Sequence, residues 1–446
     1  MPQYHIWTMG CQMNQADSDR LAAKLEGIGY TPSLSPNEAD LVVINSCVVR
    51  QSAEDKAANR LNSLKALKRR RPEAVIALMG CMVGPGERQI GELRARFPHV
   101  SVFAPPQQEE IILEAVAPLS PHPGMDVACV PGVVPDDRLN IAAYVSVIFG
   151  CDEFCTFCIV PYRRGRERSR PIAEVVGEVE SLAARGVREV TLLGQIVDSY
   201  GHDLPDKPDL ADLLEAVNEV DGLDRLRFLT SHPKYMSERL IDAVARLDKV
   251  CEFINLPFQA GDDDVLRAMR RPYTADEYRS LAGRIRERLP GAALTTDVIV
   301  GFCGETEEQF QRTVDLVEEL RFDKVHIAPY SARAGTIASR QLADDVPLEV
   351  KEERRSRLEA VQERIAGEIN ERLVGQTLEV LVEGRKNGKW SGRTRTNKLA
   401  FFADLGEWRG KTVPVTIEQA SPWALQGRLA PTAQATGRRI ITLQVV

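Results

Sequence analysis

Short apolar runs alternate with helical segments along most of this 446-residue chain, and this alternation constrains the fold more than any other feature. In the first 120 residues an apolar run ends in a cysteine three times: YHIWTMGC, ADLVVINSC and AVIALMGC. Repeated strand–helix units build parallel sheets, because a parallel crossover needs about a helix's length of chain. We therefore predict an α/β fold whose residues 1–120 form an open parallel sheet, with residues 49–70 as one long helix.

The three runs end at Cys11, Cys47 and Cys81. In an open parallel sheet the ligand site lies beyond the carboxyl ends of the strands. Three thiols that are far apart in the sequence could therefore converge on one edge of this sheet. Taken singly, each thiol is as well explained as a small buried side chain.

The alternation restarts near residue 141 and gives six candidate strands: AAYVSVIFG, REVTLLGQ, RLRFLTSHP, CEFINLPFQ, ALTTDVIVG and KVHIAPYS. Six units predict a central partial (β/α)6 barrel over residues 141–370, rather than a complete eight-stranded one. Polar residues cluster at the carboxyl ends of these strands, which is the functional face of such barrels. Residues 121–140 are rich in Pro and Gly and are expected to be a linker.

The chain changes character after a long charged helix that we expect over residues 346–373. Residues 371–440 alternate polar with apolar residues around an Asn387-Gly388 turn signal, which predicts a small antiparallel β-barrel. Residues 376–446 carry 11 Lys and Arg against 5 Asp and Glu, whereas the whole chain has a formal net charge of −7. Either a nucleic-acid partner or an ordinary solvated basic face explains this contrast.

No apolar run reaches the roughly 18 residues of a membrane span, and MPQYHIWTMGCQ lacks a signal-peptide pattern. We expect a cytoplasmic monomer without membrane contact. An odd number of cysteines, nine, argues against a disulfide framework and favours metal ligation or catalysis for some of them. Cys129, Cys251 and Cys303 match no ligand pattern and are expected to be structural.

The segment GCDEFCTFCIVP places Cys151, Cys155 and Cys158 in the spacing C-x3-C-x2-C. A structural zinc ion is one interpretation, but such zinc sites usually take four protein ligands. A [4Fe–4S] cluster can be held by three cysteines and then keeps one iron open for another molecule. The spacing therefore favours an iron–sulfur cluster.

This motif, placed after the first strand of a βα barrel, resembles the radical S-adenosylmethionine (radical SAM) enzymes. The resemblance implies that SAM binds the open iron and is cleaved to a radical that removes an inert hydrogen. Seven segments in order are similar to the methylthiotransferases, and most similar to their tRNA adenosine branch: MGCQMNQADSDRL, INSCVVRQSAEDK, LMGCM, CTFCIVPYRRGRERSRP, VGFCGETEEQF, YSARAGT and GRTRTNKLAFF. The last of them resembles part of a TRAM domain.

The resemblance implies that Cys11, Cys47 and Cys81 hold a second, auxiliary [4Fe–4S] cluster that carries the transferred sulfur. All six cysteines would then be catalytic through their clusters. The implied reaction is methylthiolation of carbon 2 of N6-isopentenyladenosine at position 37, in the anticodon stem-loop of tRNA. An external electron donor would be a further partner.

Two other functions stay open. The same chemistry could act on threonylcarbamoyladenosine or on a ribosomal-protein aspartate. Alternatively, the chain could be a non-catalytic iron–sulfur protein that binds RNA. NSCVVRQSAEDKA and GRTRTNKLAFF favour the isopentenyladenosine reaction.

Candidate SAM contacts follow from the same resemblance. Gly194 and Gln195 end the second barrel strand and would contact the amino group. Thr230 or Ser231 could reach the ribose, and Gly301 could let the backbone approach the adenine. Simple turn geometry is the alternative explanation for both glycines.

Two groups of cations are candidate RNA contacts, because arginine binds phosphate with two hydrogen bonds. Five arginines follow the cluster loop: Arg163, Arg164, Arg166, Arg168 and Arg170. In the C-terminal barrel, Arg393, Arg395 and Lys398 lie close to Phe401 and Phe402. These rings are neighbours on a strand, so one should face the core and only one could stack on a base.

Three positions depart from the family pattern on or near the expected active face. Ile196 stands where asparagine is common, Asn255 where histidine is common, and Cys303 where proline is common. Phe258 and Ala260 also differ. None of these changes removes a cluster ligand, but Ile196 and Asn255 put the substrate contacts in doubt.

Overall fold

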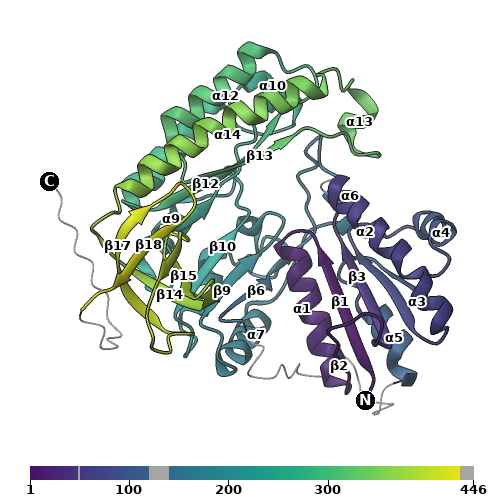
Figure 1. Ribbon diagram of the computed structural model, residues 1–446. Coiled ribbons are helices and arrows are strands. Elements are labelled where there is room, and N and C mark those ends of the chain that lie inside the picture. Colours follow the sequence, from purple (N-terminus) through teal and green to yellow (C-terminus); the bar gives the residue numbers. More distant parts are fainter. Residues whose placement is uncertain (49–50, 120–139, 432–446) are drawn as a thin grey trace.

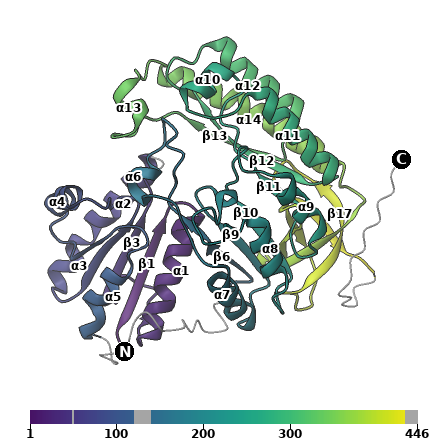
Figure 2. The same cartoon turned by 180° about the vertical axis from the view of Figure 1, so that it is seen from behind.

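The computed structural model describes residues 1–48, 51–119 and 140–431, and its principal strands form three groups (Figures 1 and 2). Almost all of the expected linker, Cys129 and the last part of the expected C-terminal barrel lie outside the described residues. In the described part, no helix combines the length and the apolar character that crossing a membrane requires.

The N-terminal sheet is parallel throughout, as predicted, with strand order β2-β1-β3-β4-β5. Its strands are β1 (Gln3–Met9), β2 (Thr31–Pro32), β3 (Leu41–Ser46), β4 (Val75–Gly80) and β5 (Val102–Ala104). Its helices are α1 (Gln12–Gly27), α2 (Gln51–Ser63), α3 (Lys65–Arg70), α4 (Glu87–Arg96) and α5 (Glu110–Val116), with a 3-10 turn η1 (Ala117–Leu119). The long helix predicted over residues 49–70 is in fact two helices, because the chain turns at Leu64.

The central part is the predicted partial barrel of six parallel strands. Two three-stranded sheets, β6-β9-β10 and β11-β12-β13, are joined by a bridge between Leu226 and Val250. The strands are β6 (Ala142–Ser146), β9 (Glu189–Leu193), β10 (Arg225–Leu229), β11 (Phe253–Asn255), β12 (Ala293–Val300) and β13 (Lys324–Pro329). Helices lie on the outside of these sheets (Figures 1 and 2): α7 (Ile172–Ala184), α8 (Leu210–Asn218), α9 (Glu238–Arg246), α11 (Ala275–Arg288) and α12 (Glu307–Leu320).

Short elements complete the mouth of the barrel: β7 (Ile148–Phe149), α6 (Val160–Arg164), β8 (Arg168–Ser169), η4 (Val197–Ser199), α10 (Asp263–Ala268) and α13 (Ile337–Gln341). The long helix α14 (Leu348–Glu371) confirms the prediction for residues 346–373. It packs along β13 and reaches the C-terminal barrel, so it links the central and C-terminal barrels.

The C-terminal part is a closed five-stranded barrel with the order β14-β15-β16-β18-β17. Its strands are β14 (Thr377–Lys386), β15 (Lys389–Thr394), β16 (Leu399–Phe402), β17 (Thr412–Ala420) and β18 (Leu425–Leu429). The predicted Asn387-Gly388 turn joins β14 to β15 with positive φ at both residues. The prediction of antiparallel pairing is wrong for one pair, because β16 and β18 run parallel. A closed ring with an odd number of strands cannot alternate direction at every step.

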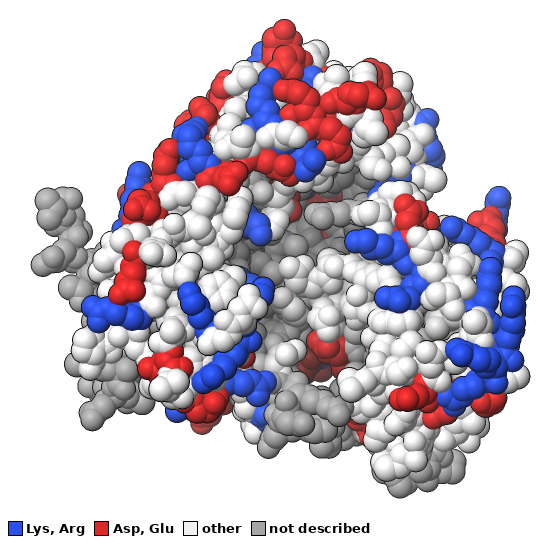
Figure 3. All heavy atoms as spheres, viewed as in Figure 1, with Lys and Arg blue, Asp and Glu red and all other residues white. Residues whose placement is uncertain are grey.

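The N-terminal sheet packs against the first half of the central barrel. Helix α1 lies along β6, and Met13 and Ala16 of this helix form a small apolar cluster with Phe149 and Leu193 of the barrel. Figure 3 shows a hollow between the three groups of strands, on the face seen in Figure 1. The contact between α1 and the barrel fixes how the carboxyl ends of the two parallel sheets face each other.

Candidate active site

Cys11, Cys47 and Cys81 meet at one edge of the N-terminal sheet. They follow β1, β3 and β4, which are neighbours in the sheet and end level with one another, since Met9 pairs with Ser46 and Ser46 with Gly80. A Cβ on Gly10 would lie 2.7 Å from the Cβ of Cys47, so only glycine lets Cys11 come this close. A hydrogen bond to Cys47 lowers the pKa of the Cys11 thiol to about 6. The convergence expected from the strand ends is therefore present.

A buried layer of hydrogen-bonded polar side chains stabilises this edge of the sheet. The side-chain amide of Asn14 donates to Asn45 Oδ1 (2.8 Å) and to the Ser46 carbonyl (3.1 Å). Its oxygen accepts from the backbone N–H and the thiol of Cys11, both at 3.4 Å. Asn45 in turn donates to Ser18 Oγ (2.9 Å). Because each of these amides is fully buried and paired, the layer holds the loop of Cys11 against the next strand.

The C-x3-C-x2-C loop forms the second thiol group at the mouth of the barrel. Gly150 reaches φ +74°, and a Cβ there would lie 2.0 Å from the Arg166 carbonyl, so the loop needs glycine before Cys151. Thr156 anchors the loop through its hydroxyl to the Ala268 carbonyl (2.8 Å). Burial raises the pKa of the Cys151 thiol, and it raises that of Cys158 to about 12. Thiols buried in this way need a compensating positive charge, such as iron, before they can act as thiolates.

The spacing of the thiols distinguishes between the two metal interpretations. A single zinc ion with Zn–S bonds of about 2.3 Å brings its thiolates to about 4 Å from one another. In the part of the chain that the structure describes, the one set of three ligand atoms within 4.8 Å of one another belongs to Asp152, Glu167 and His202. Neither cysteine triad is this tight, so neither has the geometry of a single bound zinc ion.

The two thiol groups lie next to each other. Cys81 shares an apolar cluster with Ile159, the residue after Cys158, and Arg164 of α6 donates to Cys81 Sγ at 3.2 Å. Cys47 and Cys81 are each 4% exposed, whereas Cys11 is exposed and Cys158 is partly buried. Groups bound to the two sets of cysteines would therefore lie close to each other.

Four of the predicted SAM contacts gather at the carboxyl ends of β9 and β10. Thr230, in a left-handed conformation with φ +66°, donates its hydroxyl to the Gly194 carbonyl at 2.7 Å. Gln195 follows Gly194 directly. Ser231 is buried, and its hydroxyl has no hydrogen-bond partner among the described residues. An unpaired hydroxyl in a buried place fits a polar ligand that supplies the missing partner.

Gly301 has a different environment from the other four. A Cβ at this position would lie 2.3 Å from Cγ of Lys351 on α14, and φ is +69°. Its N–H donates to Glu305 at 2.6 Å. These contacts explain the glycine by the docking of α14, so its expected contact with adenine stays a prediction.

Asn255, one of the departures, has a definite structural role here. Its side-chain oxygen accepts the Thr230 N–H (3.1 Å), and its amide donates to Thr295 and Asp297 (3.2 Å each). Asn255 thus fixes the loop that carries Thr230 and Ser231. Ile196 is buried next to Gln195.

The arginines after the cluster loop do not share one environment. Arg163 is partly buried, while Arg166 and Arg168 are exposed. Arg166 pairs with Asp152 (2.8 Å), and Arg168 lies over the Phe149 ring. Arg164 is instead buried, with 1% of its side chain exposed, so the expectation of an RNA contact is wrong for this residue.

The C-terminal cations are engaged within the chain. Arg395 binds both carboxylate oxygens of Glu252 (2.8 and 3.0 Å), and Lys398 binds Asp323 (2.6 Å). Arg393 donates to the Asn397 carbonyl (3.2 Å). The contacts of Arg395 and Lys398 dock the C-terminal barrel on the central one, whereas that of Arg393 lies within the C-terminal barrel. RNA contact by the three cations stays a prediction. Phe402 faces the core, with 1% exposed, and Phe401 is half-buried, as their alternation predicted.

Several residues of the site could not have been named from the sequence. Asn14 and Asp17 look like ordinary polar residues of an amphipathic helix, yet both are fully buried. Arg271 comes from a distant loop to Cys155 Sγ (3.5 Å). No spacing in a single sequence signals these contacts, because they depend on how separate segments pack.

Three family models match the chain in order. They are the uncharacterized protein family UPF0004 over residues 3–104, the radical SAM superfamily over residues 145–317 and the TRAM domain over residues 371–430. Together they cover the N-terminal sheet, most of the central barrel and the C-terminal barrel.

Curated relatives match almost the whole chain. A tRNA-2-methylthio-N(6)-dimethylallyladenosine synthase of Chloroflexus aurantiacus is 51% identical over 430 residues, covering 95% of this chain and 91% of the relative. Proteins of the same name from Roseiflexus sp. and Herpetosiphon aurantiacus are 50% and 49% identical, over 98% of this chain and 91% and 99% of their own lengths.

Among solved structures, the radical SAM methyltransferase TsrM of Kitasatospora setae shares the fold. The TM-score is 0.52 at 16% identity, with 76% of this chain and 77% of TsrM covered. The cobalamin-dependent SAM radical enzyme OxsB gives a TM-score of 0.51 at 11% identity, over 81% of this chain and 56% of OxsB.

Proposed function

Because the chain belongs to the family of tRNA-2-methylthio-N(6)-dimethylallyladenosine synthases, within the radical SAM superfamily, we propose that it methylthiolates carbon 2 of N6-isopentenyladenosine at position 37 of tRNA. The observation that carries this function is the pair of cysteine triads, which the hydrogen bond from Arg164, in the segment that follows Cys158, to Cys81 brings together (3.2 Å). The relatives' shared name favours this substrate over threonylcarbamoyladenosine and over a protein.

The six cysteines hold two [4Fe–4S] clusters in this proposal. Cys11, Cys47 and Cys81 bind the auxiliary cluster, and Cys151, Cys155 and Cys158 bind the cluster of the radical step. When bound, these clusters and SAM supply the sulfur, the methyl group and the radical that removes the hydrogen from carbon 2. The protein places the substrate carbon between the two triads.

The residues at the carboxyl ends of β9 and β10 hold SAM in this proposal. Gly194 and Gln195 contact the amino group of SAM in this proposal, and the unpaired Ser231 hydroxyl donates to the ribose. Thr230 is tied to Gly194 and Asn255, so its role is to position the loop. The backbone of Gly301 contacts the adenine of SAM in this proposal.

For the RNA we propose Arg163, Arg166 and Arg168 as contacts at the mouth of the site. Arg393, whose side chain is partly exposed, contacts the RNA in this proposal, and Arg395 and Lys398 support RNA binding by fixing the C-terminal barrel in place. The domain boundaries at about residues 120, 140 and 370 then separate three roles along the chain: sulfur donation, radical formation and RNA placement.

A further basic surface extends over α2 and α3. Residues 56–71 contain seven Lys and Arg and no Asp or Glu, in a chain that is acidic as a whole. Lys56, Lys65 and Arg69 are exposed and have no acidic partner among the described residues. Figure 3 shows Lys and Arg gathered on the right of the face that carries the hollow, where α2, α3 and α4 lie in Figure 1. We assign this surface to the tRNA backbone outside the active site.

We also propose that the enzyme works as a cytoplasmic monomer with an external electron donor.

An assay with the purified, cluster-loaded protein tests the function. Anticodon stem-loop RNA carrying isopentenyladenosine is incubated with SAM and a reductant, and nucleosides are analysed by mass spectrometry. The 2-methylthio product is expected from this RNA and not from RNA carrying threonylcarbamoyladenosine. Conversion of the second RNA alone would overturn the substrate assignment.

A further inference from the structure

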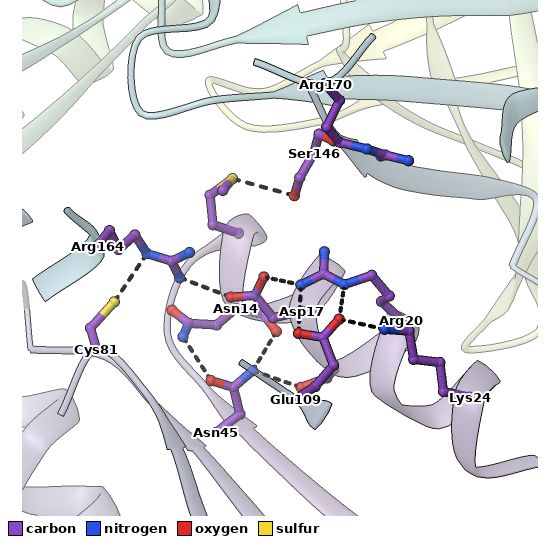
Figure 4. A network of polar contacts seen from close by, with 12 residues as sticks. Asn14, Asp17, Arg20, Lys24, Asn45, Cys81, Glu109, Ser146, Arg164 and Arg170 are labelled. Carbon is purple, nitrogen blue, oxygen red and sulfur yellow. Dashed lines mark hydrogen bonds and ion pairs between the residues drawn. The ribbon is translucent and has the colours of Figure 1, made fainter. Parts of the chain in front are cut away.

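Arg164 is a buried cation that joins the two cysteine triads. It ends α6, six residues after Cys158, yet its guanidinium reaches the N-terminal sheet. Its Nε donates to Cys81 Sγ at 3.2 Å, and its Nη2 donates to Asp17 Oδ2 at 3.0 Å. Figure 4 shows this side chain between Cys81 and Asp17. The short segment from Cys158 to Arg164 therefore contains a ligand of one proposed cluster and contacts a ligand of the other.

Asp17 is itself held firmly on α1. Its carboxylate is fully buried and also binds Arg20 (3.3 Å), which binds both oxygens of Glu109 (2.5 and 3.2 Å). Arg20 in turn lies over the ring of Phe149, close to Cys151 in the sequence. The network thus crosses twice between the N-terminal sheet and the central barrel, and Figure 4 shows the crossing that Arg164 makes.

The third nitrogen of the Arg164 guanidinium is unpaired, which indicates that a ligand binds beside it. Nη1 of Arg164 is buried and has no hydrogen-bond partner among the described residues. A buried N–H without a partner is costly, and arginine cannot relieve the cost by losing its proton. A cluster held by Cys11, Cys47 and Cys81 would bring thiolate and sulfide acceptors to this place, so the unpaired nitrogen fits the group proposed there.

We propose that Arg164 is a positioning residue that holds the two cluster sites at a fixed separation and raises the reduction potential of the auxiliary cluster through its hydrogen bond to Cys81. This inference rests on the proposed function, since it needs Cys11, Cys47 and Cys81 to hold a cluster. Hydrogen bonds and positive charge at cluster sulfurs favour the reduced state, which carries one more negative charge. Lysine could not replace Arg164 fully. The planar guanidinium donates to a thiol and a carboxylate at the same time, and a single ammonium group does not reproduce this geometry.

A redox titration of the full-length protein tests the effect on potential. Cys155→Ala serves as the background, so that the spectroscopic signal of the auxiliary cluster is seen alone. Arg164→Gln should shift the midpoint potential of this cluster to a lower value, and Arg164→Lys should shift it less. Arg354→Gln is the matched control, because this buried arginine pairs with Glu305 (2.9 Å) and contacts no cysteine among the described residues. Equal potentials in Arg164→Gln and the control would overturn the proposal.

Product analysis tests the positioning. In Arg164→Gln with all six cysteines present, SAM cleavage to 5′-deoxyadenosine should continue, while methylthiolated product per 5′-deoxyadenosine should fall about 10-fold or more. If Arg164→Gln fails to fold, Asp17→Asn decides, because it keeps the bond to Cys81 but weakens the tie between the N-terminal sheet and the barrel. An unchanged product ratio in Asp17→Asn would then contradict the positioning role.

The wild-type protein separates failure of this inference from failure of the function. If wild-type protein contained one cluster instead of two, the auxiliary site itself would be refuted, and the role of Arg164 with it. If wild type contained two clusters and made product, but its Arg164 variants matched the control, only the role of Arg164 would be refuted.

Discussion

Asp198 is a carboxyl group in a fully buried place at the mouth of the barrel. Both of its oxygens accept the backbone N–H of His232 (3.0 Å each). Burial raises the pKa of Asp198 to about 8, and burial lowers the pKa of His232 to about 2. Both side chains are thus mostly uncharged at neutral pH, next to the loop of Thr230 and Ser231.

This shift predicts a pH dependence of stability. Between its ordinary pKa near 3.8 and about 8, Asp198 keeps a proton in the folded state that the unfolded chain releases. The contribution to stability is therefore complete below pH 4 and is lost as pH rises toward 8, by about 1.4 kcal/mol per pH unit. Asp198→Asn stays neutral, so chemical unfolding should show it gaining about 3 kcal/mol relative to wild type from pH 5 to pH 7.

The exposed Asp206 provides the control, and Asp206→Asn should follow wild type at every pH. A constant difference between Asp198→Asn and wild type would contradict the raised pKa.

At the residue scale, what could be predicted follows from local pattern. The positions of Cys11, Cys47 and Cys81 follow from strand ends, which apolar runs mark clearly. Arg164 could not be assigned, because it lies in a run of arginines that all look like surface residues. Its burial depends on α1 packing against the barrel, which no local pattern encodes.

The helix pair α2 and α3 offers a prediction at the scale of elements. Lys56→Glu, Lys65→Glu and Arg69→Glu combined should weaken tRNA binding, because each cation that meets a phosphate releases a counterion. The slope of log affinity against log salt should fall by about 3, one per cation. Lys207→Glu, an exposed lysine outside these helices, is the control. An unchanged slope in the triple variant would remove this surface from the binding site.

The docking of the C-terminal barrel on the central barrel offers a second prediction at the scale of elements. Arg395→Ala and Glu252→Gln should each destabilise the protein by about 1–3 kcal/mol, since both break a partly buried pair with two hydrogen bonds. The double variant should be little less stable than the less stable of the two single variants, because both substitutions remove the same ion pair. If Arg395 served RNA alone, Glu252→Gln would leave stability unchanged, and thermal unfolding separates the two cases.

At the same scale, the periodic patterns predicted the elements well. Six strands of the barrel and α14 lie where the alternation placed them, because apolar spacing over several turns or strands leaves few alternatives. The break at Leu64 was missed, since Leu64 and Leu67 continue the apolar stripe of α2 without interruption. The parallel pair β16–β18 follows from closure of the ring, which no single strand shows.

The whole molecule joins two cysteine triads on separate sheets into one site, and this predicts different defects for the two triads. Cys155→Ala should abolish cleavage of SAM to 5′-deoxyadenosine. Cys47→Ala should keep this cleavage but form no methylthiolated nucleoside, because the sulfur-bearing site is lost. Each variant should contain about half of the iron of wild type. Loss of SAM cleavage in Cys47→Ala, with its remaining cluster intact, would contradict the separation of roles.

Nucleoside mass spectrometry on tRNA tests the central claim most directly. The gene is introduced into a bacterium that makes isopentenyladenosine but lacks the methylthiolating activity. The 2-methylthio form of isopentenyladenosine should appear with wild-type protein and be absent with Cys11→Ala and with Cys155→Ala. Isopentenyladenosine that stayed unconverted in the presence of folded, iron-loaded wild-type protein would contradict the account.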